Sequence, residues 1–127
     1  MGSVRVAMIP ALQLLAVAAG GAVGAVLRYS VYRVVETGFP WATFIVNIAG
    51  CMLASYLMFS DGDLAAGTWR LFLFVGLFGA FTTMSTFSIE TVGLLADGET
   101  AAATVNIVLN SVVCVAGAAI GRHLALL

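Results

Sequence analysis

Long apolar segments alternate with short polar segments along the whole chain. Four windows contain no charged residue, and they cover positions 7–27, 39–59, 71–89 and 100–121. Each window has the length of roughly 20 residues that a helix needs to cross about 30 Å of hydrocarbon. The pattern therefore predicts an all-α membrane protein with a single transmembrane domain over residues 1–127. Its four helices are expected at about 7–33, 40–59, 69–96 and 100–125.

The composition indicates that lipid is the solvent for most side chains. Of the 127 residues, 62% are hydrophobic and 9% are charged, whereas a soluble domain is about half apolar and a quarter charged. A chain of this length has too little interior to bury so much apolar surface. The net charge of −1 and the absence of a basic patch argue against a nucleic-acid partner. The first apolar run could also serve as a signal peptide, but it is long and three more spans follow.

The distribution of arginines favours one orientation in the membrane only weakly. An even number of spans places both chain ends on one side, which carries Arg5, Arg70 and Arg122, while Arg28 and Arg33 lie on the other side. Arginine near helix ends favours the cytoplasm, so this small bias predicts insertion in both orientations. Opposed copies could then pair. We expect an antiparallel, dual-topology homodimer in the cell inner (plasma) membrane.

Polar side chains recur in the middle of the apolar windows, where a polar group without a partner is costly. The second window holds Asn47, and the fourth holds Asn106, Asn110 and Ser111. The third holds a cluster of hydroxyl groups, which belong to Thr82, Thr83, Ser85, Thr86 and Ser88. None of these side chains is ionisable. The windows therefore offer hydrogen-bond donors without a buried acid or base.

The stretch GLFGAFTTMSTFSIE, residues 76–90, places these hydroxyls directly after two glycines. Ser and Thr often bond to the carbonyl one turn back or to a neighbouring helix, which explains some of the hydroxyls. Glycines followed by hydroxyl residues at mid-span also predict a break in the third helix. Unwound backbone is tolerated in a membrane where it is buried in protein or lines a cavity. Its freed carbonyls can coordinate a small cation, and the following half-helix points its positive N-terminus into the membrane.

Aromatic side chains close to the expected helix break suggest a path for an anion. Phe81, Met84 and Phe87 recur at every third position, a spacing that also suits a lipid-facing or packed stripe. The edge of a phenylalanine ring is positive. Together with amide and hydroxyl donors, such an edge could bind a small anion that has lost its water. Cys51 and Cys114 lie mid-span without metal-binding spacing. The spans contain no nucleophile–base pair that would indicate an enzyme.

Three motifs together resemble the CrcB/Fluc family of fluoride channels. GGAVGAVLRY, residues 20–29, resembles the family's GGxxGAxxRY motif of the first helix. FPWATFIVNIAG resembles the start of its second helix, with the family's asparagine falling on Asn47. GLFGAFTTMSTFSIE resembles its GxxGGxTTFSTFSxE signature. The length and the four-helix pattern match as well, so the resemblance covers almost the whole chain.

The resemblance implies a passive channel that exports cytoplasmic fluoride through two pores in an antiparallel dimer. Asn47 and Phe87 match pore positions, and Arg28 matches a vestibule arginine. The remaining candidates for the pore are Thr83, Ser85, Thr86 and Ser88 in the third helix and Asn110 and Ser111 in the fourth. Gly79 and Thr82 match the positions whose backbone carbonyls, from both subunits, hold a central structural Na+.

Two positions depart from the family pattern. Met84 stands where the family usually has the first of two pore phenylalanines, and Ala80 replaces the second glycine of a pair. Methionine is flexible and polarizable but lacks the positive ring edge. A heterodimer with a paralogous subunit is therefore an alternative to the homodimer.

Two other classes of membrane protein fit the pattern less well. A small multidrug-type transporter needs a membrane-buried glutamate in its first helix, and window 7–27 contains none. A non-transporting membrane subunit would explain the apolar composition and the small residues. It would not explain the clustered hydrogen-bond donors.

Overall fold

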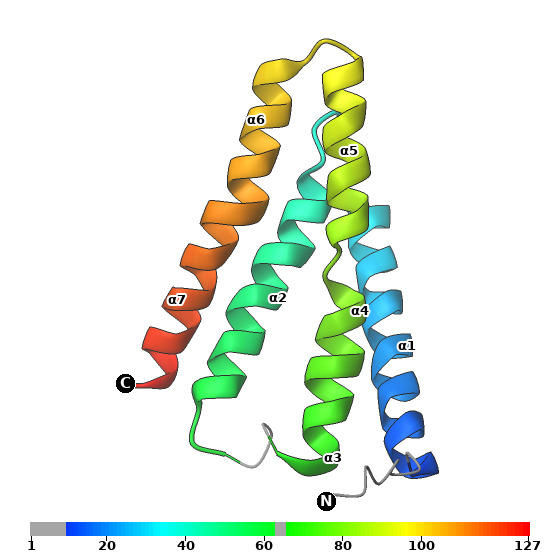
Figure 1. Cartoon of the computed structure of the whole chain (residues 1–127), viewed down its shortest axis with the longest axis vertical. Coiled ribbons are helices and arrows are strands. Elements are labelled where there is room, and N and C mark those ends of the chain that lie inside the picture. The colour runs from blue at the N-terminus through cyan, green and yellow to red at the C-terminus, as the bar shows by residue number, and fades with distance from the viewer. Residues whose placement is uncertain (1–9, 63–65) are drawn as a thin grey trace, which may run out of the picture.

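Four helical spans run back and forth along the molecule (Figure 1). The computed structural model describes residues 10–62 and 66–127, and all regular structure within them is helical. The first two spans are α1 (Ala11–Val34) and α2 (Trp41–Phe59). The third span comprises α3 (Gly67–Arg70), η2 (Leu71–Phe78), α4 (Gly79–Phe81) and α5 (Met84–Ala96). The fourth comprises α6 (Thr100–Val108), η3 (Leu109–Val113) and α7 (Cys114–Ala125).

All four spans are long and apolar enough to cross a membrane, which confirms the prediction of an all-α, multi-pass membrane protein. The first described helix begins at Ala11. The expected start at about residue 7 lies outside the described residues, and so does Arg5. The segments η2 and η3 are π-helical, with wider turns than the α-helices that flank them. The bend expected in the third span is also present, between α4 and α5.

Glycines allow α1 to pack closely against the first half of the third span. A Cβ atom added to Gly20 would lie 2.1 Å from the carbonyl oxygen of Phe72, and one added to Gly24 would lie 2.2 Å from that of Leu77. From the other side, a Cβ on Gly76 would lie 2.7 Å from the carbonyl oxygen of Val17. Small residues at these positions let the two backbones touch, as is usual between helices in membranes.

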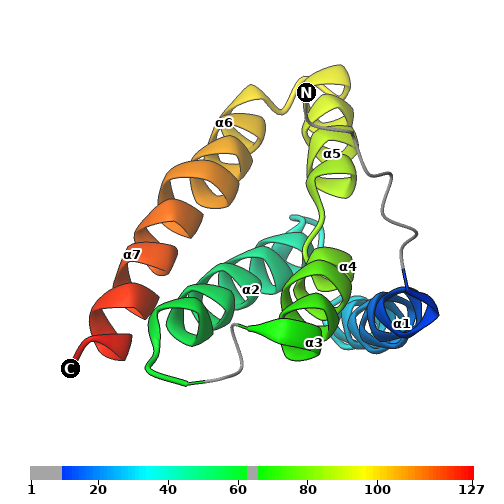
Figure 2. The same cartoon turned by 60° about the horizontal axis from the view of Figure 1, so that its bottom comes forward.

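A second close packing joins α2 to α7, which run in the same direction (Figure 1). A Cβ on Gly121 would lie 2.4 Å from the carbonyl oxygen of Met52, and one on Gly117 would lie 2.3 Å from Cδ1 of Ile48. Across the described bundle, α1 and α7 lie on opposite sides, with α2 and the third span between them (Figure 2). The buried space of one chain is consequently small.

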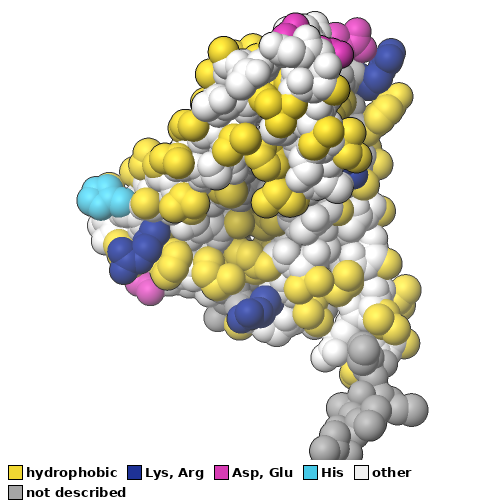
Figure 3. All heavy atoms as spheres, turned by 45° about the horizontal axis from the view of Figure 1, so that its top comes forward, with side chains coloured by type: hydrophobic (Ala, Val, Ile, Leu, Met, Phe, Trp, Pro, Cys, Tyr) yellow, Lys and Arg dark blue, Asp and Glu magenta, His cyan; other side chains and the backbone are white. Residues whose placement is uncertain are grey.

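The outer surface is apolar between charged groups near the two ends of the bundle (Figure 3). Large side chains such as Leu12, Ile89 and Val115 are 65%, 73% and 70% exposed. An exposed apolar surface of this extent is stable against lipid or against another protein, not against water. The architecture therefore matches the lipid environment predicted from composition.

Candidate functional site

The third span is interrupted at Thr82 and Thr83, which both have extended backbone conformations. Their φ and ψ angles are −84° and 156° for Thr82 and −148° and 120° for Thr83. The sequence predicted a break after Gly76 and Gly79, but both glycines are helical, and Gly76 serves the contact with α1. The break begins after Phe81. The N-terminus of α5, with its partial positive charge, thus lies in the middle of the bundle.

Asn47 of α2 satisfies the backbone at the break. Its Oδ1 accepts a hydrogen bond from the Thr83 N–H at 2.8 Å, and its Nδ2 donates to the Thr83 carbonyl at 3.1 Å. The side chain is 8% exposed. Unpaired backbone groups are costly in hydrocarbon, so this pair of bonds replaces the helical bonds that the break removes.

Arg28 of α1 satisfies a second backbone group at the break. Its Nε donates to the Ala80 carbonyl at 3.0 Å. In a continuous helix that carbonyl would accept from the N–H four residues later, at Met84, which instead begins α5. Arg28 also lines a pocket of about 360 Å³ with Ala25, Tyr29 and Tyr32. The guanidinium therefore lies between an open pocket and the broken helix.

Two other carbonyls at the break have lost their helical donors. The Thr83 N–H, which would bond to Gly79 in a continuous helix, donates to Asn47. The Thr86 N–H, which would bond to Thr82, donates to Thr83 Oγ1 at 3.2 Å. Backbone carbonyl oxygens are ligands that hard cations accept. The carbonyls of Gly79 and Thr82 therefore fit the demands of a small cation such as Na+, and both residues line a pocket of about 240 Å³.

A chain of amide side chains leads from the break to the fourth span. Asn47 Nδ2 donates to Asn110 Oδ1 at 2.8 Å, and Asn110 Nδ2 donates to Asn106 Oδ1 at 3.0 Å. Asn106 Nδ2 donates in turn to Thr91 Oγ1 at 3.0 Å. Asn106 is fully buried. Amides from two spans and a hydroxyl from a third thus form one connected line of neutral donors and acceptors.

The predicted hydroxyl residues divide into two groups. Thr83 Oγ1 bonds to Thr86 Oγ1 at 3.0 Å and lies 3.4 Å from Ser85 Oγ, so these three hydroxyls cluster at the start of α5. Ser88 and Ser111 instead donate to the carbonyls of residues 84 and 107 of their own helices. Both are exposed on this chain. Their local bonds are the ones that Ser commonly makes in helices.

The side chains at the two expected aromatic positions differ in exposure. Met84 is 71% exposed, whereas Phe87, one turn later in α5, is half-buried. Residues three apart on a helix lie on neighbouring parts of one face. Met84 therefore points to a surface that this chain does not cover itself.

Sequence reasoning missed a second polar group, built by Tyr32, Thr43 and Glu90. Thr43 of α2 bonds to the Tyr32 hydroxyl and donates to the Glu90 carboxylate. Thr43 is fully buried. It precedes Asn47 by one helical turn, and that spacing is the signal that could have placed it on the same face of α2.

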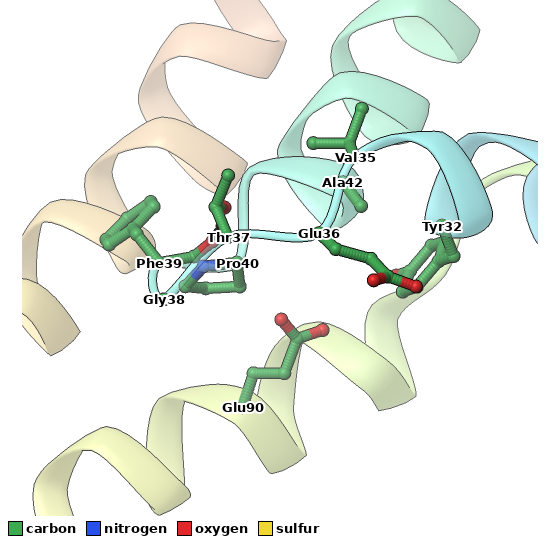
Figure 4. A pocket seen from close by; sticks show the side chains of 9 residues that line it. All are labelled: Tyr32, Val35, Glu36, Thr37, Gly38, Phe39, Pro40, Ala42 and Glu90. Carbon is green, nitrogen blue, oxygen red and sulfur yellow. Dashed lines mark hydrogen bonds between the residues drawn. The ribbon is translucent and has the colours of Figure 1, made fainter.

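Tyr32 and Glu90 line an open pocket of about 460 Å³ at one end of the bundle. Figure 4 shows Glu90 of α5 across the pocket from the segment that joins α1 to α2, with Tyr32 and Glu36 to one side. The polar residues are therefore not confined to the middle of the spans. They also reach the open pocket at this end of the bundle.

The chain is similar to a family of known proteins over most of its length. The model of the family described as CrcB-like protein, Camphor Resistance (CrcB), matches residues 15–122. A curated protein of Shewanella amazonensis named fluoride-specific ion channel FluC is 43% identical over 114 residues, which are 85% of this chain and 91% of the relative. Proteins of the same name from Idiomarina loihiensis and Desulfotalea psychrophila are 42% and 45% identical. Their alignments cover 79% and 72% of this chain and 81% and 75% of the relatives.

Proposed function

The chain belongs to the CrcB family, and on that basis we propose that it is a passive, fluoride-selective ion channel rather than an enzyme. The curated relatives carry the name of a fluoride-specific ion channel. The observation in this chain that carries the proposal is the connected line that runs from the Thr83 carbonyl through the amides of Asn47, Asn110 and Asn106 to the Thr91 hydroxyl. It occupies the middle of spans that are apolar over most of their length.

Fluoride is small and strongly hydrated, so its transfer into hydrocarbon without compensation is prohibitive. Amide N–H and hydroxyl groups can replace its water step by step, because each offers a hydrogen that an anion accepts. The N-terminus of α5 adds a fixed positive partial charge at the break without adding a full cation. Neutral donors favour passage, since an ion must leave its site as readily as it enters.

The proposed direction of transport is outward, and it needs no coupling to an ion gradient. A membrane potential that is negative inside is worth about 2.3 kcal/mol per charge per 100 mV. Fluoride that has entered a cell as the undissociated acid is therefore expelled through a passive path. A location in the cell inner membrane follows from this role.

The proposed active form is an antiparallel, dual-topology homodimer with two pores. The exposed apolar surface and the 71% exposure of Met84 support a partner subunit, which would complete the pore around that side chain. Met84 in place of an aromatic ring keeps the alternative open that a paralogous subunit supplies the partner. Phe87, Ser85, Thr86, Ser88 and Ser111 stay proposed pore residues, with Arg28 at the vestibule.

A structural Na+ at the dimer interface is part of the proposal. The carbonyls of Gly79 and Thr82, freed by the break, would hold it. The ion would supply positive charge where two broken helices meet. Replacing Na+ by choline in the buffer should lower the melting temperature of the purified protein, because a ligand bound only to the native state stabilises it.

The proposed function is tested by growth in fluoride. Bacteria without a fluoride exporter of their own, expressing this chain, should grow in acidic medium with fluoride, where cells carrying the Asn47→Ala variant should not. Equal growth arrest of both strains, with both proteins present in the membrane, would contradict a self-sufficient channel.

A further inference from the structure

A constant register relates α2 to the fourth span. Asn47 Nδ2 donates to Asn110 Oδ1 at 2.8 Å, and Ser55 Oγ donates to the Ala118 carbonyl at 2.6 Å. Both pairs are separated by 63 residues in the sequence. The two helices are parallel, so residues with this separation face each other at every turn along the contact.

The two cysteines of the chain occupy the rung between these two hydrogen bonds. Cys51 and Cys114 have the same separation in sequence, and each lies one helical turn from both bonds. The register shared with the two flanking hydrogen bonds places these residues at facing positions of α2 and the fourth span. Both are reduced, with Cys114 buried and Cys51 half-buried. Spacing along the chain gave no sign of a thiol pair, because the two residues come from different spans.

The surroundings of the thiol pair limit what it can bind. The adjacent contacts of α2 with α7 are made by Ile48, Met52 and Gly117, which are apolar. Among the described residues, no group of three His, Cys, Asp or Glu could hold a metal ion. A tetrahedral zinc site therefore cannot form here. Cys51 also lines the pocket of about 240 Å³ between α2 and the third span, so a small ion that enters this pocket can reach the Cys51 thiol.

We propose that Cys51 and Cys114 form a two-coordinate site for a soft divalent cation that prefers linear coordination, with Hg2+ as the probe. Thiolates are the ligands that soft cations select. On binding, both S–H bonds break, two metal–sulfur bonds form and two protons pass to water, without any transfer of electrons. The product is neutral, which an apolar environment favours. A monovalent cation would leave one negative charge in the same place.

Uptake of Hg2+ by the purified full-length protein tests the proposed metal site independently of any channel activity. After one equivalent of HgCl2 and a wash with excess glutathione, the intact mass should rise by one mercury atom less two protons. The variants Cys51→Ala and Cys114→Ala should each lose the metal to glutathione. Their apparent affinity should be lower by about 100-fold or more, because a single thiol lacks the chelate effect.

Two results would overturn the site. Equal retention of mercury by the wild type and both single variants would show that the thiols react separately. A wild-type mass that keeps chloride on the metal, or that rises by two mercury atoms, would show the same. Each variant is first compared with the wild type for its elution as a folded protein, so that loss of binding is not loss of structure.

A consequence for transport rests on the proposed function and is tested separately. A metal bridge would fix α2 to α7 one turn from the Asn47–Asn110 bond. One equivalent of Hg2+ should therefore slow fluoride efflux from liposomes by about tenfold or more, given the usual sensitivity of such sites to small displacements, and excess dithiothreitol should restore it. The Cys51→Ala/Cys114→Ala double variant should be insensitive. Undiminished efflux from the fully loaded wild type would overturn this consequence and leave the site intact.

Discussion

The side chain of Asn47 bonds to both backbone polar groups of Thr83. Its Oδ1 accepts from the Thr83 N–H at 2.8 Å and its Nδ2 donates to the Thr83 carbonyl at 3.1 Å. In this way a side chain of α2 replaces the helical partners of a residue in the third span. The same Nδ2 also donates to Asn110. Asn47 thus has a structural role at the break and a place in the proposed ion path.

Replacement of Asn47 by alanine should lower both stability and fluoride flux. The variant leaves the N–H and carbonyl of Thr83 unpaired, which costs about 1–3 kcal/mol for each buried group. Thermal unfolding in detergent and fluoride efflux from liposomes measure the two effects. Asn110→Ala is the matched control, because it removes one amide from the same chain and leaves the Thr83 bonds in place. A melting temperature for Asn47→Ala equal to that of the control would contradict the structural role.

Replacement of Arg28 by methionine should destabilise the protein by about 1.5–3 kcal/mol, the range for hydrogen bonds to charged groups. The reason is that Arg28 Nε bonds to the Ala80 carbonyl at the end of α4. Arg33→Met is the matched control in the same helix. Arg33 pairs with Glu36 at 3.8 Å, and the two side chains are 66% and 72% exposed, so its loss should cost less than about 1 kcal/mol. The melting temperatures of the two variants test this prediction. A larger decrease for Arg33→Met than for Arg28→Met would refute the stabilising role of the Arg28–Ala80 bond.

Addition of a methyl group to Gly24 should disrupt the packing of α1 on the third span. The new Cβ would lie 2.2 Å from the Leu77 carbonyl oxygen, and overpacking of this kind costs about 1–3 kcal/mol or more. Gly21→Ala is the control, because nothing lies within 4 Å of its added Cβ. Alanine there should be neutral or stabilise the helix by up to about 1 kcal/mol. Yield of folded protein and melting temperature should therefore separate two substitutions only three residues apart.

Changes at the two aromatic positions of α5 should have unequal effects on transport. Phe87→Ile should reduce fluoride efflux about tenfold, if its ring edge contributes roughly 1.4 kcal/mol to passage. Met84→Phe should keep or raise efflux, because Met84 is 71% exposed and a larger side chain meets no clash within its own chain. If Met84→Phe lowered the rate of fluoride efflux more than Phe87→Ile, the ion path would be shaped around the methionine side chain.

The four spans could be predicted because lipid imposes a simple length requirement. Charge-free windows of roughly 20 residues are needed to cross hydrocarbon, and the windows ending near Phe59 and beginning near Thr100 correspond directly to helix ends in the structure. The break predicted near the middle of the third span is also present, between α4 and α5, but its cause differs from the predicted one. Glycines were taken as the cause, but Gly20, Gly24 and Gly76 serve close contacts between helices. Sequence alone does not distinguish a glycine that frees the backbone from one that lets a neighbour approach.

The residues of the candidate site could be predicted as neighbours only where they belong to the same sequence motif. The hydroxyls of Thr83, Ser85 and Thr86 are neighbours in sequence and in space. The bonds from Thr43 to Glu90 and from Asn106 to Thr91 join different spans. Their partners depend on how the helices are rotated against each other. The rotation of one helix against another cannot be read from a single sequence.

Whether the chain is a self-sufficient fluoride channel is tested most directly by fluoride efflux from liposomes that contain only this purified protein. Fluoride is read with an electrode, and chloride is measured in parallel. A passive fluoride channel should release fluoride fast without loss of chloride, and the release should not depend on a proton gradient. The Asn47→Ala variant in the same vesicles should lose most of the fluoride signal. No fluoride release from folded wild-type protein, or equal release of chloride, would contradict a self-sufficient fluoride channel.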